Sequence, residues 1–172
     1  MREKWIVETK KGDFNGLSAK LKVSPLAVRC LMNRGVESEQ EMREFLYGTL
    51  DDLHDPFLMK GMDEAVREIV KAKEQGRKVA IASDFDCDGI FSAYILWKGF
   101  QKIGLDSEIF TPDRVKEGYG LNRRIVDEAL AGGRDFLVTC DNGIAANEEV
   151  DYAKKLGMTV IVTDHHEVQE KM

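Results

Sequence analysis

Acidic residues and histidines follow three short β-branched segments, each at the point where a strand is expected to end. They are Asp84, Asp86 and Asp88 after residues 79–82, Asp141 after residues 136–140, and Asp164, His165 and His166 after residues 159–163. The carboxyl ends of parallel strands share one edge of a sheet, so we expect these side chains to converge on one crevice. Carboxylate oxygens with one or two imidazoles suit manganese, magnesium or zinc, and two such ions clamp a phosphoester. The pattern therefore predicts a metal centre for phosphoester chemistry.

Asp86 and Asp88 alternate with other residues, so their carboxylates point the same way if the turn stays extended. Other interpretations of the same segments are weaker. Residues 84–89 also resemble the start of an EF-hand calcium loop. That loop would place its bidentate glutamate at residue 95, which is Ile95, and an expected strand precedes it instead of a helix. Asp141-Asn142-Gly143 alone is typical of a turn, but three such clusters after three strands favour a metal site.

The elements that must position these residues fall into two parts. The expected helices are residues 17–22, 25–33, 38–46, 62–75, 90–103, 122–131 and 147–156, and the expected strands are 79–82, 107–111, 136–140 and 159–163. The alternation after Lys78 predicts an α/β fold with a mostly parallel, doubly wound sheet and helices on both faces. A small helical N-terminal region precedes it. We expect a division into residues 1–76 and 77–172.

Composition and charge narrow the class of protein. The chain has 172 residues, 43% of them apolar, which suits one domain with a small appendage. No apolar stretch approaches the roughly 20 residues of a membrane helix, and three cysteines without C-x-x-C spacing suit the reducing cytoplasm. The net charge is −6, but residues 1–35 carry eight Lys/Arg and three Asp/Glu, a net +5. Because a metal partly neutralises clustered carboxylates, this charge does not exclude a phosphate substrate.

Three motifs carry a family resemblance. They are Asp84-x-Asp86-x-Asp88-Gly89, Asp141-Asn142-Gly143-Ile144 and Asp164-His165-His166. Together they resemble the first three motifs of the DHH phosphoesterase superfamily. Within it, the chain is similar to RecJ-type single-stranded-DNA exonucleases through residues 50–56, the loop at residues 118–121 and the N-terminal helical extension. Ala82 stands where the pyrophosphatase and oligonuclease branches carry a histidine, which also favours the RecJ branch.

The resemblance implies a metal-dependent enzyme that hydrolyses single-stranded DNA from 5′ to 3′ in DNA repair and recombination. It implies two Mn²⁺ or Mg²⁺ ions and a set of catalytic ligands, namely Asp86, Asp88, Asp141, His165 and His166. Asp141 would bridge the ions, and His166 would face a phosphate oxygen or the second ion. Asp84 would either ligate a metal or support the ligands, and Asp164 would orient the histidines. We expect no membrane partner, and the sequence identifies no repair-protein partner.

Two further segments suggest contacts with nucleic acid. Arg114 and Arg123 flank Tyr119, a mixture that could guide a DNA backbone and stack a base, although ordinary exposed charge is the commoner explanation of this pattern. Residues 17–36 have helix-turn-helix spacing. Their expected packing residues, Leu26, Val28, Leu31 and Met32, favour instead a helical cap packed on the sheet.

The family's fourth motif, its later phosphate-binding domain and an oligonucleotide-binding barrel do not occur in this sequence, which ends six residues after His166. We therefore expect a fragment, truncated before the fourth motif, with an incomplete metal pair and little or no nuclease activity alone. Two alternatives stay open. One is a DHH-type phosphodiesterase acting on oligonucleotides or cyclic dinucleotides, and the other is a non-catalytic module that binds nucleic acid or a partner.

Overall fold

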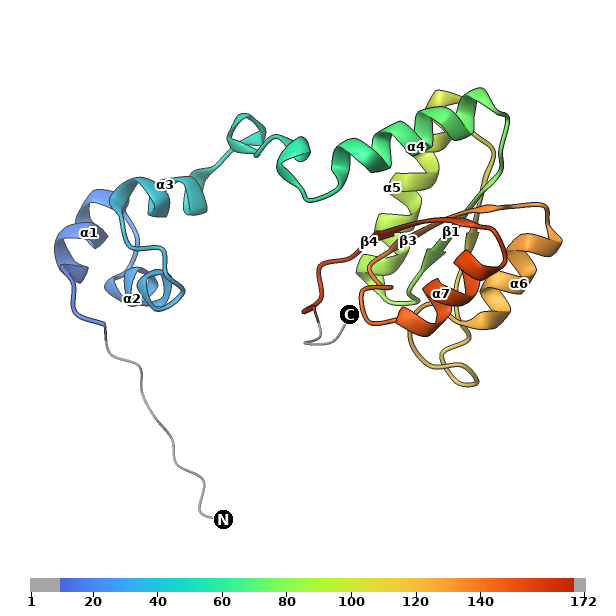
Figure 1. The fold of residues 1–172 in the computed structure, drawn as a ribbon. Coiled ribbons are helices and arrows are strands. Elements are labelled where there is room, and N and C mark those ends of the chain that lie inside the picture. The colour runs from blue at the N-terminus through green and yellow to red at the C-terminus, as the bar shows by residue number, and fades with distance from the viewer. Residues whose placement is uncertain (1–9, 169–172) are drawn as a thin grey trace, which may run out of the picture. The chain divides into compact units, whose positions relative to one another are not determined.

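A computed structural model describes residues 10–168, in two compact units that divide between residues 58 and 59 (Figure 1). The described residues of the first unit form α1 (Phe14–Leu21), α2 (Pro25–Asn33), α3 (Glu39–Tyr47) and two 3-10 turns, η1 (Leu50–Asp52) and η2 (Pro56–Leu58). The second unit contains α4 (Met62–Glu74), β1 (Val79–Ser83), α5 (Cys87–Ile103), β2 (Ser107–Phe110), α6 (Arg123–Ala131), β3 (Phe136–Cys140), α7 (Asn147–Lys155) and β4 (Thr159–Thr163).

Side-chain caps explain where the helices of the first unit begin. The Ser24 hydroxyl accepts a hydrogen bond from the amide of Ala27, with proline at the first helical position of α2. Ser38 and Glu41 form the expected capping box at α3. Helix α1 begins three residues earlier than expected, because the Asp13 carboxylate accepts a hydrogen bond from the amide of Gly16.

The first unit has its own small hydrophobic core. Its buried side chains are Leu21, Val28, Leu31, Met32 and Met42. Leu26 is 68% exposed, so its expected burial is wrong. It lies two residues before Val28, a rotation of about 200° that places it on the opposite face of α2. The packing of this unit on the sheet and its helix-turn-helix role stay predictions.

The sheet of the second unit is fully parallel in its described strands. Its strand order is β2-β1-β3-β4, and each neighbouring pair runs in the same direction. The chain therefore extends the sheet from β1 toward β2 and then returns to the other side of β1 with β3. Ligands bind at such a reversal of strand order, at the carboxyl ends of the strands.

Helices cover both faces of this sheet, which confirms the expected doubly wound α/β class. Val79 and Ile81 of β1 pack in a core with α4 and α5, whereas Ala80 and Ala82 pack with α6 and α7. Figure 1 shows these two pairs of helices on opposite sides of the strands. The strands β1 and β3 are buried throughout, as expected of central parallel strands.

Helix α4 belongs to the unit that contains the sheet. Ala72 is fully buried in the core with Val79 and Phe136, and Ile69 packs against the same cluster. The compact unit consequently begins at residue 59, one helix before the expected division after residue 76.

Two further features concern the length of the helices and the state of the cysteines. In the part of the chain that the structure describes, no helix has the length and apolar character needed to span a membrane. Cys30, Cys87 and Cys140 are all free thiols.

Candidate metal centre

Three aspartates are each the first residue after a strand. Asp84 follows β1, Asp141 follows β3, and Asp164 follows β4. Because these strands are neighbours in the sheet, their ends bring together two groups of possible ligands, each with atoms within 4.8 Å of one another. The groups are Asp84, Asp86 and Asp141, and Asp141, His165 and His166. Asp141 belongs to both.

Asp84 is the least satisfied polar group of the site. Its side chain is fully buried, and neither carboxylate oxygen has a hydrogen-bond partner among the described residues. A buried carboxylate without a partner is costly unless it binds a cation. Gly89 packs against its backbone, since a Cβ at Gly89 would lie 2.6 Å from the carbonyl oxygen of Asp84. A divalent ion fits this carboxylate.

The expectation that Asp86 and Asp88 lie in an extended turn is wrong. Helix α5 begins at Cys87, three residues earlier than expected, because the Asp86 carboxylate caps it by accepting a hydrogen bond from the amide of Gly89 at 3.2 Å. This bond lowers the pKa of Asp86. Asp88 lies in the first helical turn, exposed, with one oxygen 3.8 Å from Nε2 of His165. Asp86 thus joins a candidate ligand group, and Asp88 lies at its edge.

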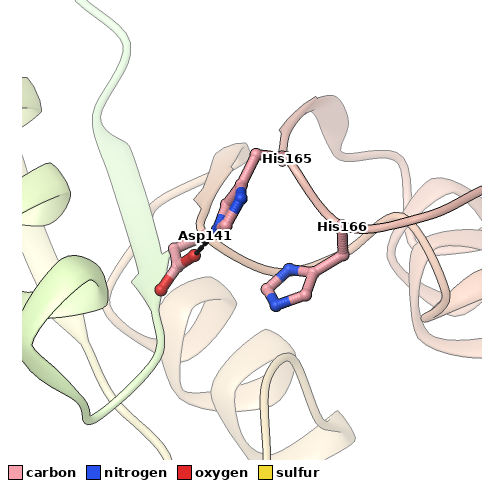
Figure 2. A group of neighbouring side chains, drawn as sticks. All are labelled: Asp141, His165 and His166. Carbon is pink, nitrogen blue, oxygen red and sulfur yellow. Dashed lines mark hydrogen bonds and ion pairs between the residues drawn. The ribbon is translucent and has the colours of Figure 1, made fainter. Parts of the chain in front are cut away.

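The Asp141 carboxylate contacts His165 directly. The His165 Nε2 atom lies 2.9 Å from Asp141 Oδ1, as the dashed line in Figure 2 marks. Asp141 is 7% exposed. Burial raises its pKa, the hydrogen bond with His165 opposes this, and the charges of Asp88 and Asp86 raise it further. The site therefore holds crowded carboxylates that a cation would stabilise.

Asp164 has the opposite environment. Its side chain is 2% exposed and accepts hydrogen bonds from the amides of Ile144, His165 and His166 at 3.0, 2.8 and 3.1 Å. His166 Nδ1 lies 2.6 Å from the same carboxylate, which raises the pKa of His166. Burial alone would raise the pKa of Asp164, but these bonds outweigh it and hold the pKa below its usual value. The carboxylate fixes the loop that carries both histidines.

Sequence reasoning missed Asn142 as a site residue. Its side chain is fully buried. Its amide nitrogen donates to the carbonyl oxygens of Ala82 at 3.1 Å and Cys140 at 2.9 Å, which joins the ends of β1 and β3. Its oxygen accepts a hydrogen bond from the amide of Leu121 at 3.1 Å. Its position next to Asp141 was the signal available in the sequence. Asn142 was missed because an exposed turn contains the same Asn-Gly pair.

The three residues expected to contact nucleic acid have different surroundings. The Tyr119 hydroxyl donates to the backbone carbonyl of Asp141 at 2.7 Å, and burial together with nearby carboxylates raises the pKa of Tyr119 to about 12. The Arg114 guanidinium lies 5.1 Å from the ring centre of Phe85, inside the first motif. Arg123 lies over the ring of Tyr152, which joins α6 to α7. Contact with nucleic acid stays a prediction for all three.

A cavity of about 530 Å³ borders the centre. Residues 117, 119–122 and 142–146 form much of its wall, and His166 also lines it. This volume is within the range typical of small-molecule sites, roughly 300–1,000 Å³. His166 thus belongs both to a candidate ligand group and to the wall of a cavity whose volume suits a small molecule.

Comparison with known proteins identifies relatives of the chain. Residues 78–172 match the model of the DHH family, N-terminal domain. The single-stranded-DNA-specific exonuclease RecJ of Bacillus subtilis is 38% identical over 165 residues, 95% of this chain. The RecJ structure from Thermus thermophilus in complex with Mn²⁺ is 29% identical, with a TM-score of 0.65 over 92% of this chain. A manganese-bound exonuclease RecJ structure is 35% identical, with a TM-score of 0.61 over 66% of it.

The relatives are much longer than this chain. It spans 21% of the length of the Bacillus subtilis exonuclease, 22% of the Thermus thermophilus structure and 29% of the other manganese-bound structure. The similarity thus concerns one part of those proteins, and the segment that matches the family model, residues 78–172, contains all three strand-end motifs.

Proposed function

Because the chain belongs to the DHH family and carries its N-terminal phosphoesterase domain, we propose that it is the N-terminal catalytic part of a metal-dependent 5′-to-3′ exonuclease for single-stranded DNA. Such an enzyme serves DNA repair and recombination, and the free thiols suit work in the cytoplasm. The observation that carries the proposal is the buried carboxylate of Asp84, which has no hydrogen-bond partner among the described residues and belongs to one of the two candidate ligand groups.

Two Mn²⁺ or Mg²⁺ ions are the proposed cofactors. Asp84, Asp86 and Asp141 would hold one ion, and Asp141, His165 and His166 the other, which makes Asp141 the bridge. When bound, such ions supply positive charge that neutralises a phosphodiester and activates water for in-line attack. The contact of Asp88 with His165 supports a place for Asp88 in the same ligand shell.

The remaining residues would orient ligands and substrate. Asp164 fixes the backbone of the histidine loop and one imidazole, so that both rings keep their direction. The Arg114 guanidinium lies over the ring of Phe85, a residue of the first motif, and would contact a DNA phosphate there. Tyr119 and Arg123 are the other proposed contacts to single-stranded DNA.

The test of this proposal starts with calorimetric titration of Mn²⁺ into the purified chain and its Asp86→Ala variant. We expect binding to the wild-type chain and at least about tenfold weaker binding to the variant. Asp13→Ala is the matched control, because it also removes an aspartate helix cap but lies at α1, in the other unit. Equal loss of affinity in both variants, or no binding by the wild-type chain, would contradict a metal centre at the strand ends.

The substrate is tested with the chain fused to the part of the Bacillus subtilis exonuclease that lies beyond the matched segment. We expect Mn²⁺-dependent release of mononucleotides from the 5′ end of single-stranded DNA, and loss of that activity with Asp86→Ala. Hydrolysis confined to dinucleotides or cyclic dinucleotides would instead favour the small-nucleotide phosphodiesterase, and metal binding without any hydrolysis would favour a binding module.

A further inference from the structure

The backbone of Asp141 has an unusual conformation for a proposed metal ligand. Its φ angle is 62°, in the left-handed region, which residues with a Cβ disfavour and which aspartate adopts more often than most of them. Such a conformation persists only where the surrounding structure holds it. The direction of the Asp141 carboxylate therefore depends on whatever fixes this one residue.

Hydrogen bonds fix Asp141 from two sides. Its amide donates to the carbonyl oxygen of Thr163 at the end of β4 at 3.1 Å. Its carbonyl oxygen accepts the hydroxyl of Tyr119 at 2.7 Å. The next residue, Asn142, is held by three hydrogen bonds, of which the one to the amide of Leu121 comes from the same loop as Tyr119. The loop at residues 118–121 thus contacts the Asp141 turn at two points.

This loop has the close approach and the anchor that such a role needs. Gly120 has a φ angle of 77°, and a Cβ there would lie 3.4 Å from Cβ of Asn142, so the loop lies directly on the turn. Arg124 of α6 binds both carboxylate oxygens of Glu117 and the carbonyl oxygen of Thr111. The loop is therefore tied to a helix that belongs to the core of the sheet.

We infer that Tyr119 and Asn142 are positioning residues, which hold the left-handed turn of Asp141 and thereby set the affinity of the metal centre. This inference rests on the proposed function. It assigns the Tyr119 hydroxyl to the protein backbone, whereas the exposed part of its ring stays free for substrate. A substrate that shifts the loop at residues 118–121 would therefore also shift the Asp141 carboxylate.

The experiment is calorimetric titration of Mn²⁺ into the wild-type chain and two phenylalanine variants. Tyr119→Phe keeps the ring and removes the hydrogen bond to Asp141. Tyr152→Phe is the matched control, because its hydroxyl donates to Asp127 at 2.8 Å on α6, away from the ligand groups. We expect Tyr119→Phe to weaken Mn²⁺ binding about tenfold, the lower bound for loss of an outer hydrogen bond at a metal site, and Tyr152→Phe to leave it unchanged. Thermal unfolding of both variants shows whether their stabilities change alike.

Equal Mn²⁺ affinity of Tyr119→Phe and the wild-type chain would overturn the inference and leave the proposed function intact. Absence of Mn²⁺ binding by the wild-type chain would overturn both. The same measurement in a His166→Ala background separates two routes, because the Tyr119 hydroxyl also lies 3.3 Å from ring nitrogens of His166. A persistent effect of Tyr119→Phe supports the backbone route, and its disappearance overturns it.

Discussion

Two aspartates with buried side chains occupy equivalent positions in the sheet and have opposite surroundings. Asp84 follows β1 and Asp164 follows β4, each as the first residue after its strand. Asp84 has no hydrogen-bond partner among the described residues. Asp164 accepts hydrogen bonds from three backbone amides and also contacts an imidazole. Residue type and position along the strand are the same, so the difference comes from what surrounds each carboxylate.

Under the proposed function, the comparison distinguishes a carboxylate that would bind a cation from one that fixes the histidine loop. Asp164 is stabilised by the protein itself, and its bonds fix the histidine loop. We expect Asp84 to lower the stability of the metal-free chain, because burial removes its water and no described residue donates a hydrogen bond to it. We therefore expect substitutions at the two positions to change stability in opposite directions and metal affinity in the same direction.

The largest effect is expected for Asp84→Asn. The amide keeps the size of the side chain and removes its charge, so Mn²⁺ affinity should fall at least about 100-fold, beyond the loss of an outer hydrogen bond. Without metal, the free energy of unfolding of the variant should exceed that of the wild-type chain by about 1–3 kcal/mol. Calorimetry and urea unfolding measure the two effects. A less stable variant with normal Mn²⁺ affinity would contradict the role of Asp84.

Asp164→Asn should reduce both the free energy of unfolding and the affinity for Mn²⁺. An amide nitrogen cannot accept the hydrogen bonds that both carboxylate oxygens now accept, so at least one buried donor loses its partner, at about 1–3 kcal/mol of unfolding free energy. Mn²⁺ affinity should fall about 10-fold, because the histidines lose their orientation. Urea unfolding that leaves this variant as stable as the wild-type chain would remove the contrast with Asp84.

Gly89→Ala tests the packing beneath Asp84. The new methyl group would lie 2.6 Å from the carbonyl oxygen of Asp84, so we expect a loss of about 1–3 kcal/mol of unfolding free energy and weaker Mn²⁺ binding. Gly99→Ala is the matched control in the same helix, because no atom lies within 4 Å of its Cβ position. That control should gain up to about 1 kcal/mol of unfolding free energy, because alanine favours a helix more than glycine does. Similar stabilities of the two variants would show that Asp84 is not held by this contact.

The smallest effect concerns a paired carboxylate at the surface. The neighbouring Arg124 holds the pKa of Glu117 at about 2, so the pair stabilises the folded chain above the ordinary pKa of glutamate, and this contribution is lost as the pH falls through about 2. Glu117→Gln should therefore melt at a slightly lower temperature at pH 7, with a difference that shrinks between about pH 4.5 and 2. A difference that is constant with pH would argue against the ion pair.

The fold could be predicted from the sequence because its signals are local. The capping box at Ser38 and Glu41 and the β-branched strands each specify an element within a few residues. The convergence of Asp84 and Asp141 also followed from strand ends sharing one edge. The cap formed by Asp86 was missed, since one aspartate serves equally as a ligand in an extended turn and as a helix cap.

The supporting contacts of the site could not be predicted in the same way. The hydroxyl of Tyr119 reaches the carbonyl of residue 141, and Asn142 joins the ends of two strands. Such contacts depend on how a loop folds back over the sheet edge, and neither residue type nor spacing specifies that path. The difference between Asp84 and Asp164 has the same origin, because it depends on which backbone amides surround each carboxylate.

The central claim is that the strand ends form a metal centre around Asp84 and Asp141. Anomalous scattering at the manganese absorption edge, from crystals of the chain grown with Mn²⁺, tests it most directly. We predict a manganese peak within coordination distance of oxygens of both carboxylates. Manganese bound only to exposed carboxylates elsewhere, with Asp84 still without a partner, would contradict the account.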